Sequence, residues 1–158
     1  MSDRYLAFVN SNFGRRLAGS LGLPAPVRLE RWMAGRARPV DGALLLGGDG
    51  ALAEAASGVL NKLTDESYAD VEGRFGLKRW TAEHGPKLKA LVFDASALTK
   101  FEQLIELRNF FQPAMKGLGK CPRVVVLGRA PESLKDPIAA SVQRSLEGFT
   151  RSDRKSVV

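Results

Sequence analysis

The sequence predicts an α/β protein in which a parallel sheet of about four strands lies between two layers of helices, preceded by a helical N-terminal arm. Two observations lead to this class. Short, wholly apolar runs recur after residue 42 and end in glycine or aspartate, as strands buried on both faces do. Segments with helical spacing of apolar residues separate these runs, and such alternation favours right-handed crossovers and a three-layer, Rossmann- or flavodoxin-like domain.

The predicted arm covers residues 1–41. Residues 5–9 suggest a short helix, and Ser11 or Asn12 is placed to cap a second helix that Gly22 ends. Two prolines follow, so the helix does not resume. The irregular segment that leads into the domain contains Trp32, which we expect to pack on the domain surface.

The predicted domain covers residues 42–152. Its strands are predicted at 43–46, 68–71, 89–93 and 123–127, the second being the weakest, and its helices at 51–63, 100–118 and 137–150. Pro113 is expected to kink the middle helix or to divide it in two.

A glycine loop follows the first strand, at the edge where ligands bind in parallel sheets. The segment from Gly48 to Ala53 matches G-x-G-x-x-G/A between a strand and a helix, where backbone N–H groups can face a pyrophosphate. The candidate cofactor-binding residues are Gly47, Gly48, Gly50 and Asp94. Two features oppose a working site: Asp49 puts a carboxylate beside the phosphate, and Asp70 is only a weak candidate for holding a ribose. The loop is therefore either a nucleotide site or a tight turn, and Asp94 is either a ligand contact or a cap.

Other candidate chemistry is sparse. His84 is expected on the surface and Cys121 is expected to be an inert thiol, and neither belongs to a pattern of metal ligands. The net charge of +7 is spread over the chain without interleaved aromatic residues, so we expect no nucleic-acid partner. No apolar run is long enough for a signal peptide or a membrane span, so we expect a cytoplasmic protein without a membrane partner.

Several segments together resemble one enzyme family: VNSNFGRRLAGSLGLPAPVRLERW, LLLGGDG, LVFDAS, FFQPAMKGLGKCPRVVVLG and RSLEGFTRS. From residue 3 to about residue 152 the chain resembles the N-terminal half of the high-molecular-weight 3-oxoacyl-ACP reductases, which are short-chain dehydrogenase/reductases. The resemblance implies a non-catalytic, flavodoxin-like domain ahead of a C-terminal reductase domain. That second domain would carry NAD(P)H and the catalytic residues, so no cofactor is expected for this chain.

The resemblance also locates two substituted positions. Short-chain reductases use a Tyr and a Lys four residues apart, ahead of a segment like GFTRS. Counting back from Gly148, these positions fall on Ala139 and Gln143, while Gly128 and Arg129 stand where a Ser is expected. Alanine cannot donate a proton and glutamine cannot stabilise a tyrosinate, so no catalytic residue is predicted.

The last six residues, DRKSVV, resemble the translation of a common DNA-sequencing adaptor, so residues 153–158 are predicted to be a non-native tail. The last strand of the domain would then be missing by truncation, with an exposed sheet edge and poor solubility. Candidate partners are the parent's reductase domain, a second copy in a homodimer, and an acyl carrier protein. The alternative function is a nucleotide- or acyl-carrier-binding module, and a flavin-binding domain is a weaker third.

Overall fold

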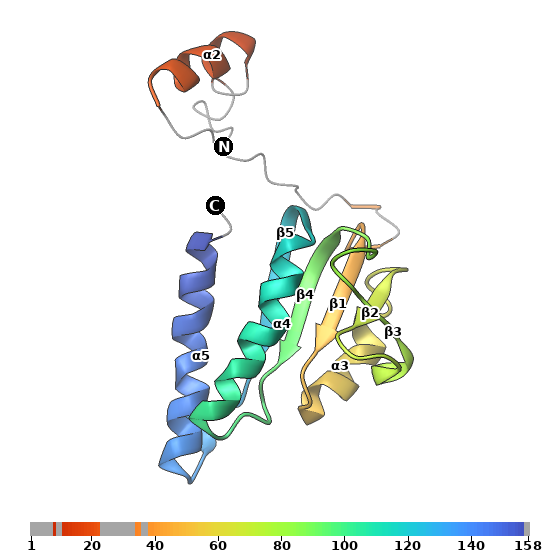
Figure 1. Ribbon diagram of the computed structural model, residues 1–158, viewed down its shortest axis with the longest axis vertical. Coiled ribbons are helices and arrows are strands. Elements are labelled where there is room, and N and C mark those ends of the chain that lie inside the picture. The colour runs from red at the N-terminus through yellow and green to blue at the C-terminus, as the bar shows by residue number, and fades with distance from the viewer. Residues whose placement is uncertain (1–7, 9–10, 23–33, 36–37, 157–158) are drawn as a thin grey trace. The chain divides into compact units, whose positions relative to one another are not determined.

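A computed structural model describes residues 8, 11–22, 34–35 and 38–156 of the chain (Figure 1). The chain divides into two units, residues 1–34 and 35–158, and each is considered by itself. In the first unit, helix α2 spans Asn12–Ser20, and the Ser11 hydroxyl accepts a hydrogen bond from the Gly14 amide at 3.0 Å. Gly22 follows the helix with a φ of +62°. The predicted cap and stop are confirmed, while Trp32 and most of residues 5–9 lie outside the described residues.

The second unit contains a five-stranded parallel sheet in the order β3-β2-β1-β4-β5. Its strands are β1 (Ala43–Gly47), β2 (Ser67–Ala69), β3 (Lys78–Arg79), β4 (Leu88–Asp94) and β5 (Leu118–Leu127). The four predicted strands are all present. The fifth, β3, has two exposed residues and no apolar pattern, which is why the sequence gives no sign of it.

The helices of this unit are α3 (Ala51–Leu60), η1 (Arg74–Gly76), η2 (Phe101–Leu104), α4 (Ile105–Lys116), η3 (Pro131–Ser133) and α5 (Pro137–Ser156). The predicted helix at 100–118 is divided at Leu104, and not at Pro113, which lies inside α4 on its exposed side. There the carbonyl that loses its N–H partner can face solvent. The helix ends before Gly117, where an added Cβ would lie 2.2 Å from the Trp80 ring.

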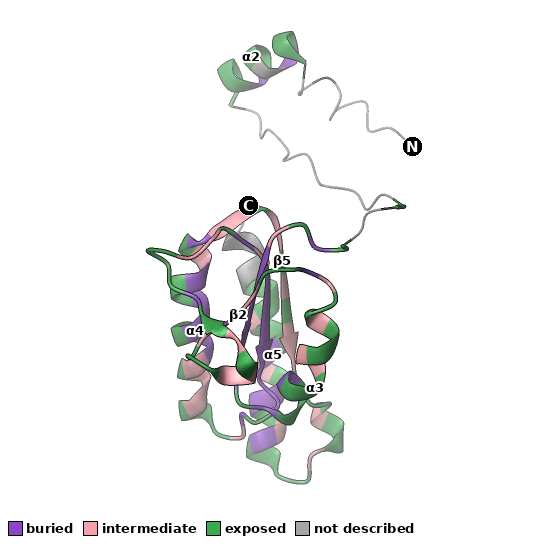
Figure 2. Ribbon diagram, turned by 90° about the vertical axis from the view of Figure 1, so that its right-hand side faces the viewer, coloured by how far each residue is buried: buried purple, intermediate pink, exposed green. Residues whose placement is uncertain are grey.

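The central strands β1 and β4 are buried on both faces. On one face, α4 and α5 cover a core that includes Leu91, Phe93, Phe110 and Val142. On the other face, α3 covers a smaller core around Leu46, and Figure 2 shows α3 and α4 on opposite sides of the sheet. The continuous apolar runs of the sequence follow from this double burial.

The strand order decides where a ligand site would lie. From β1, the chain proceeds to β2 on one side, and later returns to β4 on the other side. The order 3-2-1-4-5 is that of the Rossmann fold rather than the flavodoxin order 2-1-3-4-5, and its crevice opens at the carboxyl ends of β1 and β4. The glycine loop and Asp94 lie at those two strand ends.

Candidate functional site

The fold brings the predicted site residues together at the carboxyl edge of the sheet. Gly47 ends β1 and Gly50 precedes α3, while Asp94 ends the neighbouring strand β4. Gly47 is paired with Phe93 in the parallel ladder, so the two strand ends lie side by side. The predicted proximity of the glycine loop and Asp94 is therefore present in the structure.

Asp94 points into the glycine loop and away from solvent. Asp94 is 1% exposed, and its Oδ2 atom accepts a hydrogen bond from the Ala53 amide at 2.6 Å. Its Oδ1 atom accepts a second hydrogen bond from the Ser96 amide at 2.9 Å. Ala53 is the third residue of α3, so Asp94 caps a helix that has no side-chain cap of its own.

The glycines of the loop fit around this carboxylate. A Cβ added to Gly50 would lie 2.3 Å from Asp94 Oδ2 and 2.2 Å from Ser96 Oγ. Gly48 has a φ of +91°, and a Cβ there would lie 2.2 Å from the Asp94 carbonyl oxygen. The loop therefore needs glycine in order to pass around Asp94, and the space next to the helix N-terminus is occupied by a residue of the chain itself.

Asp49 and Asp70 are held by one arginine that the sequence analysis did not single out. Arg74 Nη2 lies 2.6 Å from Asp49 Oδ1, and its Nη1 lies 2.9 Å from Asp70 Oδ1. Asp70 follows β2 directly, which is where a ribose-binding acid is expected in this fold. Instead, both oxygens of its carboxylate accept hydrogen bonds from Arg74 Nη1, at 2.9 and 3.0 Å. The spacing of four residues from Asp70 to Arg74 was the only available signal for this pair.

Gln143 joins three segments at the same edge of the sheet. Its Nε2 atom donates hydrogen bonds of 2.8 Å to the carbonyls of Ala95 and Leu98, and its Oε1 accepts one of 2.8 Å from the Arg129 amide. The residue is 4% exposed. Three hydrogen bonds thus satisfy the buried amide and fix α5 against the ends of β4 and β5. Ala139, one turn earlier, is equally buried.

The histidine and the cysteine that the sequence offers as candidate reactive residues lie outside the glycine loop. His84 is on the surface, as predicted, and its Nδ1 atom lies 3.9 Å from Glu83 Oε2. Cys121 lies in β5 with a φ of +49°, at the place where the pairing with β4 shifts register. Within residues 8–156, the described part of the chain contains no cluster of three or more metal-ligating side chains.

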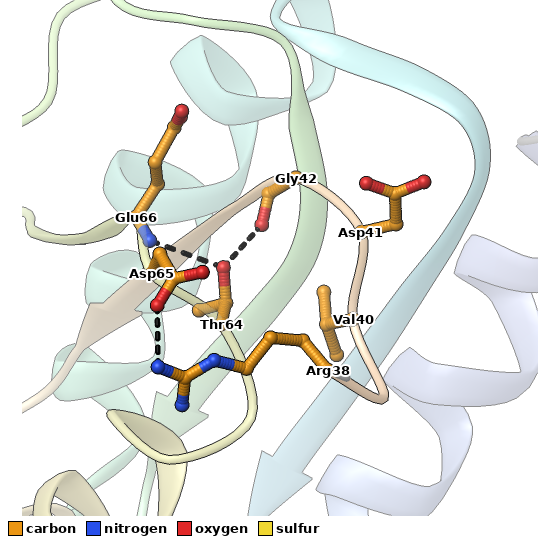
Figure 3. A pocket seen from close by; sticks show the side chains of 7 residues that line it. All are labelled: Arg38, Val40, Asp41, Gly42, Thr64, Asp65 and Glu66. Carbon is orange, nitrogen blue, oxygen red and sulfur yellow. Dashed lines mark hydrogen bonds and ion pairs between the residues drawn. The ribbon is translucent and has the colours of Figure 1, made fainter. Parts of the chain in front are cut away.

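A hollow lies at the opposite, amino edge of the sheet (Figure 3). It has a volume of about 370 Å³ and is lined by Arg38, Val40, Asp41, Gly42, Thr64, Asp65 and Glu66. Thr64 donates a hydrogen bond to the Gly42 carbonyl at 2.7 Å, and Arg38 pairs with Asp65 at 2.5 Å. The hydrogen bond and the ion pair connect the segments that lead into β1 and β2. We therefore interpret the hollow as a structural junction between these two strands.

No helix in the described part of the chain combines the length and the apolar composition needed to cross a bilayer. Comparison of the chain with models of known protein families and with curated proteins gives no match.

Proposed function

We propose that this chain is a non-catalytic, structural Rossmann-like domain of the kind that precedes the reductase domain in the high-molecular-weight 3-oxoacyl-ACP reductases. The observation that supports the structural role is the contact of Asp94 with the N-terminus of α3. In a dinucleotide-binding domain this helix end faces a pyrophosphate. Here a buried carboxylate of the chain accepts the hydrogen bond from the third amide of the helix.

Electrostatic repulsion supports the same conclusion. A phosphate placed in the loop would meet Asp94 at the helix end and Asp49 at the exposed side of the loop. Two unit charges 4 Å apart repel by about 4 kcal/mol at the effective dielectric constant of a protein surface. Arg74 offsets part of the charge of Asp49, but its hydrogen bonds are already directed to Asp49 and Asp70. The alternative of a nucleotide-binding module is therefore the weaker proposal.

The residues at the substituted positions support the absence of catalysis. Ala139 has no titratable proton, and the Gln143 side chain is committed to three structural hydrogen bonds. The parent enzyme that we propose would reduce 3-oxoacyl thioesters with NAD(P)H through its own C-terminal domain. This part of the proposal rests on the sequence segments named above.

The proposal is tested by adding NADPH, and separately NADH, to the purified chain in a calorimeter. We expect no binding heat at millimolar nucleotide, and no cofactor-dependent reduction of an acetoacetyl thioester. A saturable binding isotherm that disappears in Gly50→Ala would overturn the structural assignment of the loop. Turnover of the thioester by the chain alone would overturn the assignment as non-catalytic.

A further inference from the structure

The amino edge of the sheet carries a group of basic side chains that has no role in the proposed function. We name it the basic edge, and it consists of Lys87, Lys89, Lys116, Lys120 and Arg123. Lys87 and Lys89 stand at the start of β4, Lys116 ends α4, and Lys120 and Arg123 belong to β5. All except Lys89 are exposed.

Backbone pairing places these residues around one turn. The amide of Leu88, which lies between Lys87 and Lys89, donates a hydrogen bond of 2.9 Å to the carbonyl of Gly117, which follows Lys116. Lys89 Nζ donates a hydrogen bond of 2.7 Å to the Lys120 carbonyl. Ala90 is the ladder partner of Arg123. Residues from three separate elements are thus gathered at the turn between α4 and β5.

In the described part of the chain, the exposed members of this group form no ion pairs with carboxylates. Arg123 directs one nitrogen to the Pro39 carbonyl, a neutral group, at 3.4 Å. The preceding unit, residues 1–34, contains five arginines and two acidic residues, so its sequence offers no excess of negative charge for this edge.

The surroundings favour a protein surface over other anions. The Trp80 ring lies next to Gly117 in this turn, but Trp80 is 6% exposed and donates its ring N–H to the Pro86 carbonyl, so it offers no stacking face to unpaired bases. None of the large exposed apolar side chains lies in the turn from Lys116 to Lys120, whereas membrane-surface binding needs apolar side chains that enter the lipid. A compact group of cations on strand ends complements an acidic patch on a protein.

We infer that the basic edge is a docking site for an acidic protein surface, such as one face of a helix that carries several carboxylates. The inference rests on the positions of the charges and not on the proposed function, because the edge lies at the opposite ends of the strands from the glycine loop. Docking here would leave the carboxyl edge of the sheet free. The affinity of the basic edge for its partner would fall as salt is added, because salt screens the attraction between solvent-exposed cations and carboxylates.

The test uses the full chain and a fluorescent helical peptide that carries four glutamates on one face. Anisotropy is measured at low and at physiological salt for the parent chain and for Lys116→Glu/Lys120→Glu. We expect salt-sensitive binding that weakens by about tenfold or more in the double variant, because like charges then face each other. Lys116→Gln/Lys120→Gln should give an intermediate loss, and circular dichroism checks that each variant is folded.

A matched control reverses two exposed cations outside the basic edge, in Arg108→Glu/Lys135→Glu, which changes the net charge by the same amount. This control should bind the peptide as the parent chain does. Equal weakening in both double variants would overturn the docking site, because net charge alone would then explain binding. Tighter binding to an oligothymidylate of equal charge than to the peptide, or to vesicles with anionic lipids, would overturn the assignment to a protein partner.

Discussion

The carboxylate of Asp94, at the end of β4, lies 2.6 Å from the backbone nitrogen of Ala53 in the first turn of α3. The two residues are 41 positions apart in the chain. A strand-end aspartate thereby supplies the capping group that the helix lacks, and it supplies it at the place where this fold otherwise receives a phosphate. One contact therefore caps the helix and occupies the position at which dinucleotide-binding domains of this fold receive a phosphate.

Removing the charge of Asp94 is expected to destabilise the domain. Asp94→Asn keeps the size of the side chain but cannot accept two backbone hydrogen bonds as a carboxylate does. We expect a loss of about 1.5–3 kcal/mol in the free energy of unfolding, measured by urea denaturation. Asp41→Asn, at an exposed position, is the control and should change little. Equal stabilities of the Asp94 variant and the parent would contradict the capping role.

The glycine loop is expected to tolerate no side chain at Gly50. The backbone φ of −76° suits any residue, so the cost of Gly50→Ala comes from the 2.3 Å approach of its Cβ to the Asp94 carboxylate. We expect a loss of about 1–3 kcal/mol, as for other overpacked sites. Gly58→Ala is the matched substitution, because nothing lies within 4 Å of its Cβ inside α3. It should raise stability by about 0.5–1 kcal/mol in the same denaturation experiment.

Gln143 is expected to matter for folding rather than for chemistry. Gln143→Met preserves the approximate volume but leaves the Arg129 amide and two carbonyls without their partner. We expect a loss of at least about 1–3 kcal/mol in thermal or chemical unfolding. Gln112→Met, on the exposed side of α4, is the control. If both substitutions prove neutral, the three hydrogen bonds do not hold α5 in place.

The carboxyl group of Glu132 gives a prediction on pH. A hydrogen bond from its own backbone amide, and then one from Arg144, lower the pKa of Glu132 below its ordinary value. The resulting stabilisation is present above the unfolded pKa and is lost as the pH falls through the folded pKa. Arg144→Gln should raise the Glu132 pKa part of the way to its ordinary value, because the backbone hydrogen bond remains. A carbon-detected NMR titration measures this shift, and an unchanged titration curve would refute the contribution of Arg144.

Much of the architecture could be predicted because buried strands and helices have characteristic local patterns of apolar residues. The predicted strands at 43–46, 89–93 and 123–127 appear as β1, β4 and β5. The apolar runs of β1 and β4 follow from the burial of both faces of these strands, whereas β5 lies at the edge of the sheet and is only half-buried, with Val125 exposed. Strand β3 left no such pattern because its two residues are exposed. The division of the helix at Leu104 also escaped prediction, because Pro113 is the stronger local signal but lies on a face where solvent compensates the lost hydrogen bond.

The sequence by itself determined the class of fold, the glycine loop and the position of Asp94 at a strand end, because apolar periodicity and turn residues act over short distances. Only the tertiary structure decided what Asp94 binds, that Arg74 holds Asp49 and Asp70, and that Gln143 joins three segments. It also gathered the basic edge from α4, β4 and β5. The pairing of β1 with β4 and of β4 with β5 brings these partners together. Local sequence patterns could not predict these contacts, because they do not specify which strands become neighbours.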